Sequence, residues 1–207
     1  MIKVVAVCGS PRKKSMYTAL QTALDAAKAT GNDVEVELIE LRGRKINCCI
    51  HCNKCLRDGS DRCSIYNDDM TELYDKIYDA DAIILGSPVY YMNMTAQMAT
   101  FIGRFRTAFM RSVNDPEFFN NKVGAVMAVG GARHGGQETT MNALTGFFHT
   151  VGIPVCNGGG GMYEGAGLWN PGDGSTEMDD PAGLENAKKL GAKVANLARV
   201  IKKGMEA

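Results

Sequence analysis

The sequence predicts an α/β fold in which five parallel strands form one doubly wound sheet with helices on both faces. Three observations support this fold class. Short apolar runs alternate with longer segments of helical periodicity along the chain. The length of 207 residues suits one domain with a well-buried core. The sequence contains neither an internal repeat nor a linker-like stretch, so residues 1–207 are expected to form a single domain.

The first half of the chain supplies three predicted strands and two helices. Residues 2–7 are almost entirely apolar, as in a central strand of a parallel sheet. Residues 18–29 read as a helix, and residues 34–41 alternate in polarity like a more exposed strand. A second helix over residues 68–79 precedes a buried strand at residues 82–86.

The second half continues this alternation. A long helix is expected over residues 95–111, followed by the fourth strand at residues 123–129 and a helix over residues 137–151. Residues 153–156 are expected to start the fifth strand, and residues 181–203 close the chain as a helix. These elements complete the alternating pattern of a parallel sheet.

One stretch departs from the alternating order. Residues 157–180 hold eight glycines and show no periodicity, and Trp169 lies among them. A loop of that length is usually functional, so it is a candidate for a subunit contact.

Charge and composition restrict the class of protein. Lys plus Arg and Asp plus Glu both number 23, which argues against a nucleic-acid or anionic-membrane partner held by bulk electrostatics. No apolar run reaches membrane-spanning length and no signal-peptide layout is present, so a cytoplasmic protein is expected. In a reducing compartment, seven cysteines indicate metal or redox chemistry.

A cysteine-rich loop at residues 48–63 is the most specific motif. Its spacing, C-x2-C-x2-C-x7-C, is formed by Cys49, Cys52, Cys55 and Cys63. Such crowded thiols pair poorly as disulfides, whereas thiolates at this spacing are typical ligands of one iron–sulfur cluster, with 4Fe–4S favoured. Zinc, with His51 as a possible ligand, and reduced surface cysteines without metal remain alternatives. Cys48 is a possible substitute for the first ligand.

The loops after the first, third and fourth strands should meet at one edge of the sheet, where doubly wound folds bind ligands. The first loop leads into a helix and offers hydroxyl and basic groups suited to a phosphate: Ser10, Arg12, Ser15, Tyr17 and Thr18. It matches neither a Walker A loop nor a G-x-G-x-x-G fingerprint, which disfavours ATP and classical NAD binding.

The other two loops suit a flat heterocycle. The loop after the third strand is aromatic and polar and comprises Pro88, Val89, Tyr90, Tyr91, Met92 and Asn93. The loop after the fourth strand is rich in glycine, so its backbone can approach a ligand closely; its candidates are Gly131, Arg133, Gly135 and Gly136. Each loop alone is compatible with an ordinary turn, but their joint placement predicts a site for flavin mononucleotide (FMN).

These motifs together resemble one known family. The chain is similar to the iron–sulfur flavoprotein branch of the NAD(P)H-dependent FMN reductase and flavodoxin-like family. The resemblance lies in Gly9-Ser10-Pro11-Arg12, Ser87-Pro88-Val89-Tyr90 with Asn93, Phe101-Ile102-x-Arg104, Gly135-Gly136-Gln137-Glu138, and the cysteine run followed by Asp68-Asp69-Met70. It implies a flavodoxin-like sheet of order 2-1-3-4-5, bound FMN, a 4Fe–4S cluster and a homo-oligomer, either a dimer or a tetramer.

The function expected from these features is electron transfer between the cluster and FMN. The donor would resemble ferredoxin and the acceptor would be a small molecule that takes two electrons. Two alternatives remain at this stage: a cluster-free NAD(P)H-dependent FMN or quinone reductase, and a non-enzymatic electron carrier resembling flavodoxin.

Overall fold

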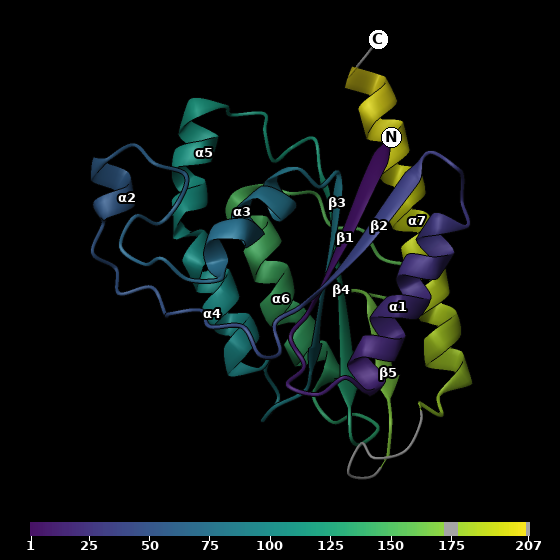
Figure 1. Ribbon diagram of the computed structural model, residues 1–207. Coiled ribbons are helices and arrows are strands. Elements are labelled where there is room, and N and C mark those ends of the chain that lie inside the picture. The colour runs from purple at the N-terminus through teal and green to yellow at the C-terminus, as the bar shows by residue number, and fades with distance from the viewer. Residues whose placement is uncertain (172–177, 206–207) are drawn as a thin grey trace.

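A five-stranded parallel sheet of order β2-β1-β3-β4-β5 forms the centre of the computed structural model, which describes residues 1–171 and 178–205 (Figure 1). The strands are β1 (Ile2–Cys8), β2 (Val34–Glu40), β3 (Ala82–Pro88), β4 (Val123–Gly130) and β5 (Ala166–Trp169). Every neighbouring pair is parallel. The predicted fold class and strand order are therefore confirmed.

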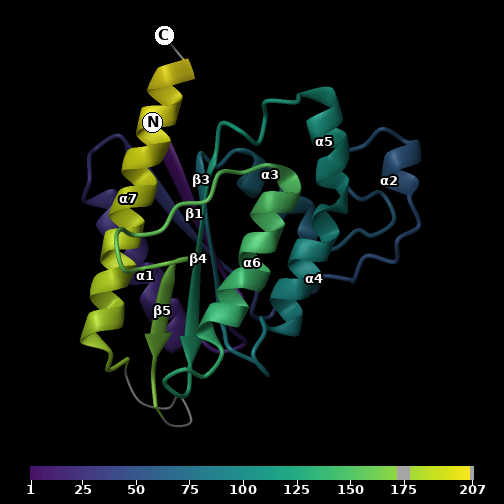
Figure 2. The same cartoon turned by 180° about the vertical axis from the view of Figure 1, so that it is seen from behind.

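Helices cover both faces of the sheet (Figures 1 and 2). One face carries α1 (Ser15–Lys28) and α7 (Pro181–Met205). The other carries α3 (Met70–Tyr78), α4 (Ala96–Arg104) and α6 (Gln137–Val151). Three shorter elements complete the fold: α2 (Lys54–Arg57), the 3-10 turn η1 (Phe105–Thr107) and α5 (Ala108–Asn114). None of the helices in the described ranges is long and apolar enough to cross a membrane.

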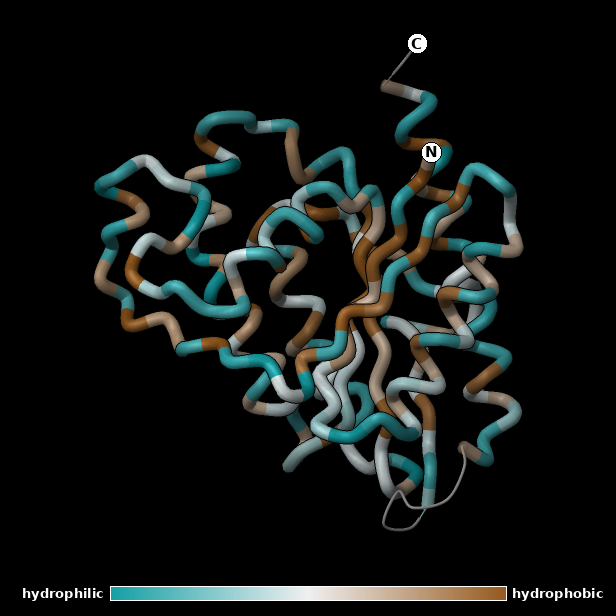
Figure 3. The backbone as a smooth tube through the Cα atoms, viewed as in Figure 1, coloured by the Kyte–Doolittle hydropathy of each residue, from teal (hydrophilic) through white to brown (hydrophobic). Residues whose placement is uncertain are grey.

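The core consists of two apolar layers, one on each face of the sheet. Strands β1, β3 and β4 are buried along almost their whole length. In Figure 3, segments of hydrophobic residues gather at these central strands. Burial on both faces explains why these strands read as continuous apolar runs. On one face α1 and α7 approach so closely that a Cβ on Gly191 would lie 1.9 Å from the carbonyl oxygen of Ala23.

The position of the fifth strand differs from the expectation. Residues 153–156 make only an isolated parallel bridge, between Val155 and Gly124, and β5 forms later, at Ala166–Trp169. Gly124 bonds the Pro154 carbonyl and the Cys156 N–H, both at 2.8 Å, after which the chain leaves the sheet and returns beside β4 following the glycine run. The glycine-rich stretch thus contains a strand; residues 172–177 of the predicted loop lie outside the described part.

The long helix expected over residues 95–111 is interrupted by η1. The carbonyl oxygen of Arg104, which a continuous helix would use internally, accepts the Tyr74 hydroxyl at 3.0 Å and the Thr107 hydroxyl at 3.4 Å. Side-chain hydroxyls that compete for a backbone acceptor in this way tighten or bend a helix. Sequence periodicity could not reveal this break because Tyr74 comes from another element.

Candidate functional site

Two candidate sites occupy different parts of the molecule: a set of loops at the carboxyl ends of the strands, and a cavity lined by cysteines. The loops after β1, β3 and β4 are joined by direct hydrogen bonds. Thr95, only 2% exposed, donates its hydroxyl to the Gly9 carbonyl at 2.7 Å and its N–H to the Ser87 hydroxyl at 3.0 Å. The N–H of Val89 donates to the Val129 carbonyl at 2.9 Å. Residues that are far apart in sequence are thereby held as one surface.

The second and third loops are also in van der Waals contact. A Cβ on Gly136 would lie 2.8 Å from the Cα of Met92, and Gly136 has a φ of 102°. Glycine is required at this position both for the conformation and for the space. The third loop is shaped by Gln137, whose amide donates to the Ala132 carbonyl and accepts the Gly135 N–H, both at 2.8 Å.

A tight turn in the second loop presents its aromatic side chains to solvent. Tyr90 and Asn93 exchange both backbone hydrogen bonds, and the two residues between them, Tyr91 and Met92, have φ values of 50° and 61°. Non-glycine residues rarely adopt positive φ, and such strain is concentrated at functional sites. Tyr91 is fully exposed, so the turn displays a flat aromatic surface beside the third loop.

The first loop has the features of an anion site. Helix α1 begins at Ser15, three residues earlier than expected, so Ser15, Tyr17 and Thr18 all lie in its first turn. Among the described residues, Lys14 at the N-cap makes no side-chain hydrogen bond to the helix. The first N–H groups of a helix need partners and attract anions. The Ser10 hydroxyl accepts the Arg12 N–H at 3.1 Å and fixes the turn before the helix.

Three residues that were not among the predicted site residues hold these loops in place. Thr95 and Gln137 are buried beneath them, and Asn170, just after β5, is 4% exposed. Asn170 donates its amide to the Ser15 hydroxyl at 2.5 Å, while its own Oδ1 is buried without a hydrogen-bond partner in the described part of the chain. Because Oδ1 is an acceptor, a ligand beside Ser15 would satisfy it with a donor such as a hydroxyl group and not with a phosphate oxygen.

The predicted FMN-binding residues are therefore brought to one edge of the sheet. In the third loop, the Arg133 guanidinium lies over the Trp169 ring at 4.3 Å, so the β5 end joins the same surface. The thiol of Cys8, at the end of β1, takes no charge there because burial raises its pKa to about 11. The donor groups and glycines present at this edge fit a phosphate with an attached heterocycle.

The second site is a small cavity of about 20 Å³ that opens to solvent beside the end of α4. All four predicted metal ligands line it: Cys49, Cys52, Cys55 and Cys63. His51 and Cys48 are not among the lining residues; the Cys48 sulfur instead lies 3.3 Å from the Thr100 hydroxyl. Four thiols around one cavity are the donor set that an iron–sulfur cluster requires.

The backbone of the cysteine-rich loop curves around this cavity. His51 and Asn53 have φ values of 53° and 56°, so the chain reverses its curvature between the first three cysteines. The side chain of Asn53 is held by Arg106, whose Nε and Nη2 donate to its Oδ1 at 3.1 and 2.6 Å. Arg57 donates to the Cys52 carbonyl at 2.9 Å. Among the described residues no three His, Cys, Asp or Glu side chains converge to hold a single metal ion.

A buried ion pair lies next to the cavity. Arg104, which lines it, bonds Asp68 at 2.6 Å, and the two side chains are 2% and 4% exposed. Burial alone would raise the pKa of Asp68, but the Arg104 guanidinium and the Asn47 N–H outweigh it and hold the pKa below its usual range. Arg104 remains charged for the same reason, with its pKa raised by Asp68.

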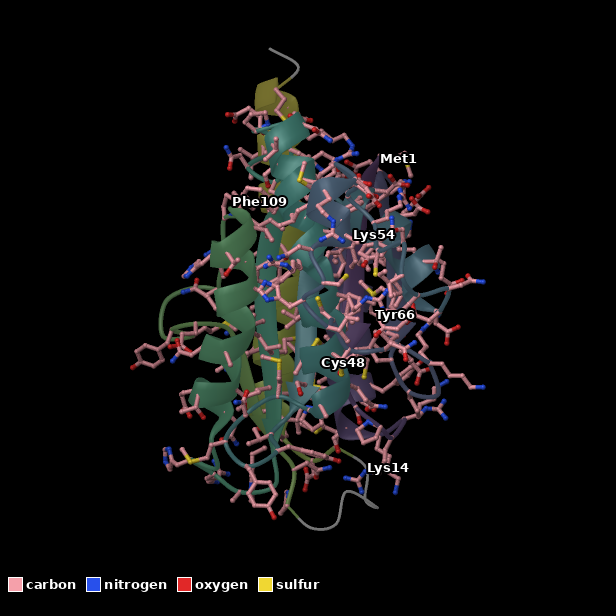
Figure 4. All side chains as sticks on the ribbon, turned by 90° about the vertical axis from the view of Figure 1, so that its left-hand side faces the viewer. Met1, Lys14, Cys48, Lys54, Tyr66 and Phe109 are labelled. Carbon is pink, nitrogen blue, oxygen red and sulfur yellow. The ribbon has the colours of Figure 1, made fainter. Side chains whose placement is uncertain are left out.

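The two sites lie at opposite ends of α4. Thr95, at its N-terminal end, binds the flavin-type loops, and Arg104, at its last residue, lines the cysteine cavity. At 1.5 Å per residue, Thr95 and Arg104 lie about 14 Å apart along the helix axis. In Figure 4, Lys54, Tyr66 and Cys48 lie around the middle height of the molecule, and Lys14, just before α1, lies near its lower end.

Comparison with known proteins agrees with this geometry. Residues 2–165 match the family described as NADPH-dependent FMN reductase. The chain belongs to this family. It is therefore a flavin-dependent oxidoreductase, as predicted, and FMN is its flavin.

Similar proteins point to the expected branch of the family. An iron–sulfur flavoprotein of Methanocaldococcus jannaschii is 39% identical over 98% of this chain and 100% of its own length. Another iron–sulfur flavoprotein, from Methanosarcina thermophila, is 32% identical over 99% of this chain and 100% of its own. The resemblance inferred from the motifs is thus confirmed.

Solved structures support the fold alone. A flavone reductase superimposes with a TM-score of 0.70 at 22% identity, over 97% of this chain and 64% of that protein, so the chain spans under two thirds of its length. A flavodoxin from the domain Archaea gives a TM-score of 0.59 at 15% identity, over 96% of this chain and 99% of that protein.

Proposed function

We propose that the protein is an iron–sulfur flavoprotein that passes electrons from a ferredoxin-like donor to a small-molecule acceptor through a 4Fe–4S cluster and FMN. The observation that carries the proposal is the single cavity lined by four cysteines in a chain of an FMN reductase family. When bound, the cluster exchanges one electron at a time and FMN one or two, so one-electron donors can drive a two-electron reduction.

Each group is assigned to residues of this chain. Cys49, Cys52, Cys55 and Cys63 hold the cluster, and His51 takes no part because it does not line the cavity. The first loop, with Ser10, Arg12, Ser15, Tyr17 and Thr18, binds the FMN phosphate at the start of α1. The strained turn at Tyr91 and the glycines of the third loop orient and cover the ring.

Thr18→Ala is expected to weaken FMN binding about ten-fold while changing riboflavin binding little. A hydrogen bond to a charged phosphate is worth about 1.5–3 kcal/mol, and riboflavin has no phosphate. Flavin fluorescence titration of the flavin-free protein with both ligands measures this. Thr22→Ala is the matched control, because the Thr22 hydroxyl donates to the Thr18 carbonyl of its own helix at 2.9 Å. Equal weakening of both flavins by Thr18→Ala would contradict a phosphate contact.

The proposed enzyme works as a homo-oligomer. Within one chain the cavity and the flavin loops are separated by the length of α4, so a neighbouring chain would shorten the path. An open groove of about 1180 Å³ between α5 and α6 supports such an assembly. It includes exposed Phe109 and shares Arg106 with the cysteine cavity, so a second copy seated there would lie next to the cysteines.

Anaerobic stopped-flow kinetics test the whole proposal. Protein purified without oxygen is expected to contain four iron and four sulfide for each FMN, consistent with a 4Fe–4S cluster. Reduced ferredoxin should bleach the flavin faster than NADPH does, and dilution below the concentration of assembly should slow that reaction. Iron-free protein that NADPH reduces rapidly would instead identify a cluster-free reductase.

A further inference from the structure

Arg104 is a buried cation that the proposed function does not yet use. It lines the cysteine cavity, yet its side chain is only 2% exposed. A charged side chain is costly to bury unless every polar atom has a partner. The burial of Arg104 therefore raises the question of which groups accept its N–H hydrogen bonds.

Two hydrogen bonds hold Nη1 of the guanidinium. Its Nη1 donates to the Asp68 carboxylate at 2.6 Å and to the Asn47 carbonyl at 3.0 Å. Asp68 is held in turn by the N–H and the side-chain amide of Asn47, at 2.9 and 3.0 Å. The Tyr66 ring, which also lines the cavity, lies 5.1 Å from the guanidinium carbon. These contacts fix the orientation of the charge.

The other side of the guanidinium is not accounted for. The Nε of Arg104 is buried and has no hydrogen-bond partner among residues 1–171 and 178–205. An unmade hydrogen bond from a buried donor costs about 1–3 kcal/mol or more when the group is charged. The cavity beside it is lined by four cysteine sulfurs, which are acceptors, and a sulfur-rich anion bound to them would satisfy this donor.

We propose that Arg104 is a positioning residue that donates from Nε to a sulfur of the cysteine-bound cluster and sets the cluster's reduction potential, with Asp68 as the opposing charge. The inference rests on the cluster proposed above. Reduction adds one electron and no proton to the cluster, so the nearby fixed cation favours the reduced form. Hydrogen bonds to the sulfurs and local charge are known determinants of such potentials.

Shifts of the midpoint potential in opposite directions, for variants of Arg104 and of Asp68, distinguish this role from a structural one. Arg104→Gln removes the cation and should lower the midpoint potential by about 59 mV, which is a ten-fold change in the equilibrium constant for a one-electron reduction. Asp68→Asn keeps the shape of the side chain and removes the anion, so the potential should rise. Arg104→Lys keeps the charge but lacks Nε, so its potential should fall between those of wild type and Arg104→Gln.

The measurement is an anaerobic redox titration followed by electron paramagnetic resonance of the reduced cluster. Lys54→Gln is the control, because it removes one positive charge next to Cys55 from a side chain that is 40% exposed. Solvent and salt screen such an exposed charge, so Lys54→Gln should change the reduction equilibrium constant of the cluster by less than about three-fold. FMN content and circular dichroism report whether each variant is folded.

Several results would overturn the inference. Shifts of the same sign in Arg104→Gln and Asp68→Asn, or shifts no larger than that of Lys54→Gln, would contradict it. If Arg104→Gln loses the cluster, Asp68→Asn decides the question, since an unchanged or lower potential there is incompatible with opposing charges. Wild-type protein without iron and sulfide would refute the proposed function instead, which separates the two failures.

Discussion

Cys52→Ala protein, purified anaerobically, is expected to lack the iron–sulfur cluster and to keep its FMN. The four cysteines line one cavity, and each would contribute one thiolate to the cluster, so the loss of any ligand should remove nearly all the iron. The flavin loops lie at the other end of α4 and use none of these residues. Iron, sulfide and flavin analysis of the same sample measures both parts of the prediction.

Cys48→Ala supplies the matched control for this experiment. Cys48 neighbours the first ligand in sequence, but its sulfur lies against Thr100 and not in the cavity. The Cys48→Ala protein should therefore retain its full iron content. If it loses iron while Cys49→Ala keeps it, the assignment of the first ligand is wrong and Cys48 replaces Cys49.

Gly191→Ala is expected to destabilise the protein by about 3 kcal/mol. A Cβ at this position would lie 1.9 Å from the Ala23 carbonyl oxygen, which is backbone and cannot rotate away. Separating α1 from α7 would loosen the apolar layer between them, and overpacking of this kind costs about 1–3 kcal/mol or more. For a chain of this size, the melting temperature should fall by about 6–12 °C. Chemical denaturation and thermal melts measure the loss.

The predicted loss of stability distinguishes Gly191→Ala from an ordinary helical substitution. Gly→Ala within a helix ordinarily stabilises it by up to about 1 kcal/mol. Gly204→Ala, on the same helix but in open space, should show that ordinary effect or none. Equal stability of the Gly191 and Gly204 variants would mean that α7 can move away from α1 without cost.

Much of the fold could be predicted because burial leaves a pattern in the sequence. Strands β1, β3 and β4 are buried on both faces and therefore read as apolar runs. Strand β5 was misplaced because it is four residues long and lies within the glycine-rich stretch, where no periodicity can develop. The turn η1 depends on hydroxyls from Tyr74 and Thr107 competing for one carbonyl, and only Thr107 is local in sequence.

The candidate site was predictable to the extent that its residues follow strands. The loops could be placed together because parallel strands end at one edge of a sheet. Asn170 was missed because it follows the misplaced strand. Gln137 was named in the third-loop motif, but its role could not be predicted because it depends on the Ala132 carbonyl and the Gly135 N–H. Spacing identified the cysteines, but it could not show that Arg104, more than forty residues later in the chain, completes their cavity.

The cysteine-rich loop has a consequence for the order of biosynthesis. Of its residues only Cys63 packs against an apolar layer, and Cys49 and Cys52 are exposed. The sheet and its helices can therefore form before any iron arrives, and the thiols remain accessible to a donor of iron and sulfide afterwards. Insertion of the cluster is then expected to be a late event at the surface of an already folded chain.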